Sequence, residues 1–215
     1  MASPLVTDNE TILRYLHVLS GIVWIGMLYF FNLVNLPLLK LQLKKPYEAN
    51  MAEKATGNIV VKTLFWFRWG AASTLLFGLI LLYGHGDEYK AALSAGGEAA
   101  YPVYAILMGV LFGLTMAFNV WVIIWPRQQK ILANNKAIAA STDEAEKKRL
   151  ADLNAPMVKE ATFASRMNTW LSVPMLWGMV FGAHGTTKWT FAVLVLVVVL
   201  LLMVTYSQAK KPKAA

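Results

Sequence analysis

The sequence predicts an all-α integral membrane protein, a bundle of five transmembrane helices with the N-terminus outside and the C-terminus inside. Of its 215 residues, 57% are hydrophobic and only 15% are charged, and the mean hydropathy is +0.49. That composition is typical of membrane proteins. The apolar residues also gather into runs long enough to cross a bilayer core roughly 30 Å thick. We therefore expect a single membrane domain over residues 1–215.

Five apolar runs are the expected spans: Ile12–Leu38, Val61–Gly84, Val103–Trp125, Ser165–Ala183 and Trp189–Tyr206. The first follows a segment without the basic region and cleavage site of a secretory signal, so we expect it to be retained as a span. The third stops at Pro126. The fourth is less apolar than the others, and the fifth is a valine and leucine run.

The charges between these runs set the expected orientation. Lysines dominate the connection between the first two runs, acidic residues the next connection, and lysines and arginines both the long connection 127–164 and the tail. Basic loops remain in the cytoplasm, which places the N-terminus outside. The charges behind the net +8 collect in these loops and the tail, so we expect no nucleic acid partner. We expect the protein in a bacterial inner membrane.

Connection 127–164 is expected to hold a cytoplasmic helix. Ser141 and Glu144 have the spacing of a capping box, in which a serine side chain caps the helix that follows. The chain contains no cysteine. This excludes disulfides, thiolate metal sites, iron–sulfur clusters and a covalently attached c-type haem.

Two histidines, each close to a glycine, form the candidate cofactor site. His17 lies about a turn inside the first run, and Gly21 follows one turn along the same face. His184 closes the fourth run, with Gly182 two residues before it. An ionisable residue in a membrane segment is costly and marks a functional site by default. The pairs predict haem b held between two helices, with His17 and His184 as axial ligands of the iron and Gly21 and Gly182 beside it.

Other interpretations of these residues stay open. A membrane histidine can be a buried group hydrogen-bonded to a neighbouring helix, and the glycines can serve helix packing alone. His85, which we expect to be an exposed loop residue, is a third candidate ligand, because the topology places all three histidines at the outer face. Three histidines could bind copper or zinc instead of haem. The glycines beside His17 and His184 favour a large flat ligand.

A second polar cluster is expected near the cytoplasmic side. Arg68, Asn119 and Asn168 share a depth there by the predicted topology, together with Asn32, Asn35 and Arg166. One interpretation is a pocket for an anionic or quinone-like substrate, bound by Arg68, Asn119 and Asn168. The other is hydrogen bonding between helices, with the arginines reaching the membrane interface and the nearby tryptophans forming an aromatic belt.

Several motifs of this chain resemble the membrane domain of the bacterial membrane-bound urate oxidase (urate hydroxylase, PuuD) family. They are LHVLSGIVWIGMLYFFNLV, RWGAAST, NVWVIIWPRQQK and SRMNTWLSVPML with the later HG, in order over residues 13–185. The resemblance implies that His17 and His184 match the family's histidines, and Arg68, Asn119, Trp125 and Asn168 its recurrent polar and aromatic positions. It also implies oxidation of urate, with electrons passed to a C-terminal cytochrome c domain. This sequence lacks that domain, so we expect a separate acceptor.

The functional expectation is a membrane-embedded haem b electron-transfer protein or oxidoreductase subunit. Its partners would be the lipid bilayer and a separate cytochrome c or other redox subunit, within a larger membrane complex in one variant. One alternative is a membrane enzyme that oxidises urate or a similar purine. Another is an accessory subunit that binds no cofactor.

Overall fold

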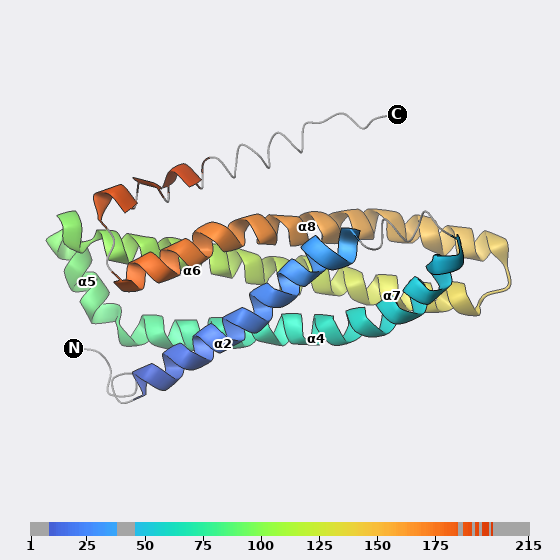
Figure 1. Cartoon of the computed structure of the whole chain (residues 1–215), viewed down its shortest axis with the longest axis horizontal. Coiled ribbons are helices and arrows are strands. Elements are labelled where there is room, and N and C mark those ends of the chain that lie inside the picture. Colours follow the sequence, from blue (N-terminus) through green and yellow to red (C-terminus); the bar gives the residue numbers. More distant parts are fainter. Residues whose placement is uncertain are drawn as a thin grey trace. The chain divides into compact units, whose positions relative to one another are not determined.

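The described part of the chain is helical almost throughout. The computed structural model describes residues 9–37 and 46–184, and beyond them residues 187–190, 192, 193, 195–197 and 199. No strand occurs among these residues (Figure 1). The all-α prediction is confirmed.

Nine helical segments follow one another in the described ranges. They are α2 (Glu10–Tyr29), η1 (Phe30–Asn35), α4 (Pro46–Gly84), α5 (Gly86–Ala95), η2 (Gly97–Ala99), α6 (Tyr101–Phe118), η3 (Asn119–Ile124), α7 (Trp125–Ala140) and α8 (Glu144–His184). Two of them, η1 and η3, are π-helical, with six residues each. Each π-helical segment directly follows an apolar α-helix.

Three helical stretches are long and apolar enough to cross a membrane: Glu10–Asn35, Ile59–Gly84 and Gly97–Ala140. They correspond to the first three expected spans. The fourth expected span lies within α8, which is helical but less apolar. Most of the fifth, residues 189–206, lies outside the described residues. The structure therefore supports a helical membrane protein with three candidate spans. The five spans and their orientation stay a prediction.

The surface of these stretches is apolar. Large side chains such as Tyr15 and Ile22 on α2 and Leu111 on α6 are at least 60% exposed. A water-soluble protein rarely leaves so many large apolar side chains on its surface, because each would remain in contact with water. Contact with lipid removes that cost.

The chain forms two compact units, each described by itself. One comprises residues 1–14, 77–116 and 170–215, and the other residues 15–76 and 117–169. The boundaries fall within α2, α4, α6 and α8, so each of these helices contributes residues to both units. We call them the terminal unit and the central unit.

In the terminal unit, α6 packs tightly on α8 through glycines. A methyl group on Gly178 would overlap with the carbonyl oxygen of Ala105 and lie 3.0 Å from the Gly109 nitrogen. A methyl group on Gly182 would overlap with the side chain of Ile106. These glycines let the two backbones approach closely, as small residues do in membrane helix pairs.

In the central unit, α2 packs on α4 around a buried tryptophan. Trp24, Leu28 and Phe67 are at most 2% exposed. The ring of Phe67 meets the ring of Phe31 edge-on, with centroids 6.0 Å apart. Gly70 allows α2 and α4 to approach this closely, because a methyl group there would lie 3.0 Å from the backbone nitrogen of Trp24.

Two expected helix boundaries are wrong. Pro126 ends the third apolar run but not the helix, because η3 continues directly into α7 and the proline falls in the first turn of α7. The expected cytoplasmic helix and the fourth span are one continuous helix, α8, which starts at Glu144.

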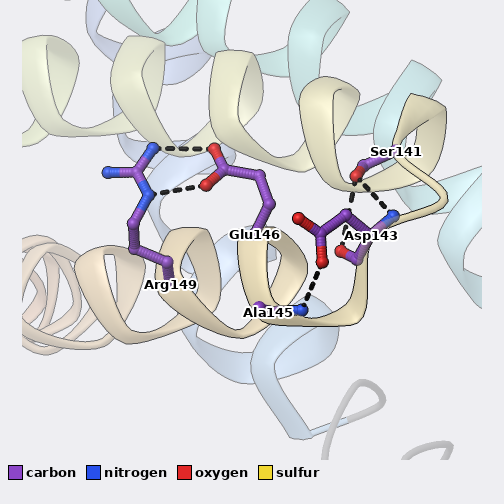
Figure 2. Close-up of polar contacts among 5 residues, drawn as sticks. All are labelled: Ser141, Asp143, Ala145, Glu146 and Arg149. Carbon is purple, nitrogen blue, oxygen red and sulfur yellow. Dashed lines mark hydrogen bonds and ion pairs between the residues drawn. The ribbon is translucent and has the colours of Figure 1, made fainter.

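The N-terminus of α8 is capped by a different residue from the one expected (Figure 2). The carboxylate of Asp143 accepts a hydrogen bond from the Ala145 N–H at 2.9 Å, which is the N-cap contact. Ser141 instead accepts the N–H of Asp143 at 3.1 Å. Glu146 accepts two hydrogen bonds from Arg149 at 2.7 Å each and makes no capping contact. The predicted Ser141–Glu144 capping box is therefore wrong by two residues.

The glycine packing predicts a position-specific cost. We expect Gly178→Ala to lower the free energy of unfolding by about 1–3 kcal/mol, because its methyl group would meet backbone atoms that cannot rotate away. Gly113→Ala is the matched control: nothing lies within 4 Å of its added methyl group. Its change should stay within about 1 kcal/mol. Reversible unfolding in detergent micelles measures both, and equal effects would contradict the packing described.

The Asp143 cap predicts that two substitutions at this position differ in their effect on stability. Asp143→Ala should lower the stability of α8 by about 1 kcal/mol, because the first amides of the helix lose their acceptor. Asp143→Asn should be nearly neutral, since asparagine caps as well as aspartate does. Amide hydrogen exchange of the first turn of α8 measures the effect. Fast exchange in both variants would show that the carboxylate charge matters rather than the cap.

Candidate functional site

His17 is fixed by a hydrogen bond from its helix to the next one. Its Nδ1 lies 2.9 Å from the backbone carbonyl oxygen of Thr74 on α4. A carbonyl oxygen only accepts, so Nδ1 carries the proton and the neutral ring has its lone pair on Nε2. The Thr74 hydroxyl donates to the Gly70 carbonyl at 2.7 Å. Metal-binding histidines are commonly oriented by such a bond to a carbonyl.

Gly21 lies one turn from His17, and packing explains it only weakly. A methyl group there would meet a single atom, the Thr74 Cγ2, at 3.8 Å, which is ordinary van der Waals contact. The close approach of α2 and α4 is made at Gly70 instead. The missing side chain at position 21 therefore leaves space beside His17 that the helix pair itself does not require.

His184 is the last residue of α8 and is exposed. Its Nδ1 donates to the carbonyl of Val180 at 2.8 Å, so its lone pair is also on Nε2. The neighbouring Gly182 faces Ile106 and the Pro102 carbonyl. Helix packing accounts for this glycine. His184 belongs to the terminal unit and His17 to the central unit, and each is described within its own unit.

His85 is buried, with 8% of its surface exposed, so the expectation of an exposed loop residue is wrong. It precedes α5, stacks on Tyr89 with ring centroids 5.8 Å apart, and donates from Nδ1 to the Leu81 carbonyl at 3.0 Å. Its Nε2 lies 3.5 Å from a carboxylate oxygen of Glu10, which also accepts a hydrogen bond from Arg14 at 2.6 Å. Burial raises the pKa of the Tyr89 hydroxyl. This cluster was not predictable from the sequence, because α2 and α5 are far apart in the chain.

The copper and zinc alternative receives no support from the side chains that the structure describes. Among them, no group of three or more histidine, cysteine or acidic side chains is placed to hold a metal ion. Haem needs only one or two axial ligands, so the paired-histidine hypothesis is not affected by this result.

The second polar cluster lies in the central unit and joins two helical elements, η1 and η3, to α8. Asn119 in η3 donates to the side-chain oxygen of Asn168 at 2.7 Å, and Asn168 is fully buried. Asn32 in η1 donates to the Ser165 hydroxyl at 2.7 Å. These bonds fit the interpretation of hydrogen bonding between helices, and they bring together two of the three residues predicted to bind substrate.

Arg68, the third of these residues, has different neighbours. Its guanidinium carbon lies 3.7 Å from the ring centre of Trp125, 5.4 Å from that of Trp121 and 5.9 Å from that of Trp69. Its Nε is buried without a hydrogen-bond partner. No described carboxylate pairs with it. These tryptophans were predicted to form an aromatic belt. Their contact with Arg68 was not predicted.

The polar cluster coincides with both π-helical segments, which the sequence analysis did not predict. Asn32 and Asn35 lie in η1, and Asn119 begins η3. A π-helical turn is rare and often marks a functional site. Asparagine within an apolar run was the available signal. It identified the place but not the helix type.

The Asn119–Asn168 bond predicts a measurable coupling. Asn168→Ala should lower the free energy of unfolding by about 1–3 kcal/mol, because it leaves the Asn119 amide without its acceptor. A double-mutant cycle with Asn119→Ala isolates the pair. If the effects of the two single variants simply add up, the bond contributes no coupling.

Comparison with known proteins assigns no family to this chain. No family model, curated protein or solved structure matches it. The functional argument therefore rests on the geometry of the two candidate sites.

Proposed function

We propose that this protein is a membrane-embedded haem b protein that transfers electrons, with His17 and His184 as the axial ligands. The observation that supports it most is the hydrogen bond from His17 Nδ1 to the Thr74 carbonyl. In the neutral ring this bond places the proton on Nδ1 and leaves the lone pair on Nε2, the form in which histidine binds iron.

The residues present fit a haem in two respects. His184 carries the same kind of bond, from Nδ1 to the Val180 carbonyl, so both rings offer Nε2. Beside His17, Gly21 provides space that the packing of α2 on α4 does not use. The fit at Gly182 is weaker, since Ile106 already occupies that face.

The ligand set decides between electron transfer and chemistry on a substrate. Bound haem b would supply an iron that gains and loses one electron. Two imidazoles would occupy both axial positions and leave none for oxygen or a substrate. The two anchoring bonds would hold the imidazoles in place in both oxidation states. That arrangement favours an electron carrier over an oxidase.

The proposal includes a topology and a partner. It places five spans in a bacterial inner membrane, N-terminus outside, with both ligands near the outer face, as the lysine-rich connections favour. The 215 residues contain no cysteine, so they cannot attach a c-type haem. The proposed electron partner is therefore a separate cytochrome c or another redox subunit.

The pyridine haemochrome spectrum of the detergent-solubilised protein tests this proposal. We expect haem b in the wild-type protein and a low-spin iron signal by electron paramagnetic resonance. His17→Ala and His184→Ala should each remove the low-spin signal, because one axial ligand is lost.

His85→Ala is the matched control, and it should keep both the haem and the low-spin signal. Size-exclusion chromatography reports whether each variant remains folded. A well-folded wild-type protein without haem b would refute the proposal and favour a cofactor-free accessory subunit.

A further inference from the structure

Arg68 is a cation within an apolar helix and has no described anionic partner. It lies in the candidate span Ile59–Gly84. An arginine in such a segment needs a partner or water, because an isolated charge in hydrocarbon is costly. Its Nε is buried and unpartnered. Among the described side chains, its neighbours are aromatic rings rather than carboxylates.

Arg127, in the first turn of α7, is paired with a carboxylate, unlike Arg68. Arg127 forms an ion pair with Glu160 and donates to the Ile123 carbonyl at 3.1 Å. The two arginines can be compared directly, because both belong to the central unit. Arg127 has the carboxylate of Glu160 on α8. Among the described side chains, Arg68 has the faces of tryptophans as its neighbours.

The rings around Arg68 form an exposed aromatic patch. Phe65 and Trp69 are 50% and 48% exposed, and Trp121 is 37% exposed. The rings of Trp69 and Trp121 meet edge-on, with centroids 6.1 Å apart. A guanidinium stacked on an indole keeps its N–H groups directed outward in its own plane, where they can reach an oxyanion. We call Arg68 with Phe65, Trp66, Trp69, Trp121 and Trp125 the arginine–tryptophan patch.

The patch lies where an apolar run ends. Trp125 is the last residue of the apolar run through α6 and η3, and Pro126, Arg127 and two glutamines follow it. Tryptophan and arginine at such a transition mark the level of the lipid headgroups. The Arg68 guanidinium is stacked on Trp125, so it reaches that level from within its own helix.

We propose that the arginine–tryptophan patch binds an anionic phospholipid, with Arg68 donating hydrogen bonds to the phosphate and the exposed rings contacting the glycerol region and acyl chains. A phosphate is the natural acceptor for an unpaired guanidinium. The exposed rings favour a lipid over inorganic phosphate, which has no apolar part to contact them. The proposal does not depend on haem binding.

Native mass spectrometry of the full chain with a defined mixture of phosphatidylglycerol and phosphatidylcholine tests it. We expect the wild-type protein to retain phosphatidylglycerol preferentially. Arg68→Gln should lower its affinity about five- to tenfold, the effect of removing one cation near a membrane surface. Arg68→Lys should lose part of the affinity, because it keeps the charge but not the planar fork.

Arg166→Gln is the matched control, since it removes an equal charge from an exposed arginine of the same unit; it should lower retention clearly less than Arg68→Gln, and an equal loss would show a charge effect without a specific site. If Arg68→Gln does not fold, immobilisation of spin-labelled lipids by the wild-type protein still tests the proposal. Equal immobilisation of both lipids would overturn it.

Two further results would overturn the proposal: unchanged retention in a folded Arg68→Gln variant, and displacement of the lipid by millimolar inorganic phosphate or urate, which would make a soluble anion the ligand. The haem content of each variant, measured in parallel, keeps this test separate from that of the proposed function.

Discussion

The structure depends on one constraint: a polar group on an apolar helix must find its partner inside the protein. In hydrocarbon no water satisfies an exposed donor, and several polar side chains of the described helices meet this requirement within their own helix. The hydroxyls of Thr74 and Thr115 donate to the carbonyls four residues earlier. His85 and His184 do the same with their Nδ1 atoms. His17 donates to a carbonyl of another helix instead, which links its ring orientation to the packing of α2 on α4.

The same constraint separates the two candidate sites chemically. At His17 and His184, Nδ1 donates to a carbonyl, so the neutral ring keeps its lone pair on Nε2. At Arg68 the donors have no described acceptor, and stacking on Trp125 compensates only part of the cost of the charge. The two histidines thus offer lone pairs, which the proposed haem would use. Arg68 offers hydrogen-bond donors and suits an oxyanion.

The glycines show why a motif alone does not define a ligand site. Gly21 and Gly182 each lie within four residues of a histidine in the sequence. In the structure, Gly182 is required by the contact of α8 with Ile106, whereas Gly21 has almost nothing opposite it. Small residues serve both backbone approach and ligand space. Only the atoms on the opposite helix distinguish the two uses, and they make packing the reason for Gly182 but not for Gly21.

The sequence alone was enough for the helical class and for three apolar helices, because composition and the length of apolar runs reflect a property that each segment carries by itself. It also located the polar cluster, since asparagines and an arginine stand out in apolar runs. It could not assign the cap of α8 to Asp143, the burial of His85 or the tryptophans around Arg68. Each of these depends on which side chain from another turn or helix reaches the position, and that choice is made by tertiary packing rather than by local composition. The π-helical turns at Asn32 and Asn119 belong with them, because a change of hydrogen-bond register leaves no mark in hydropathy.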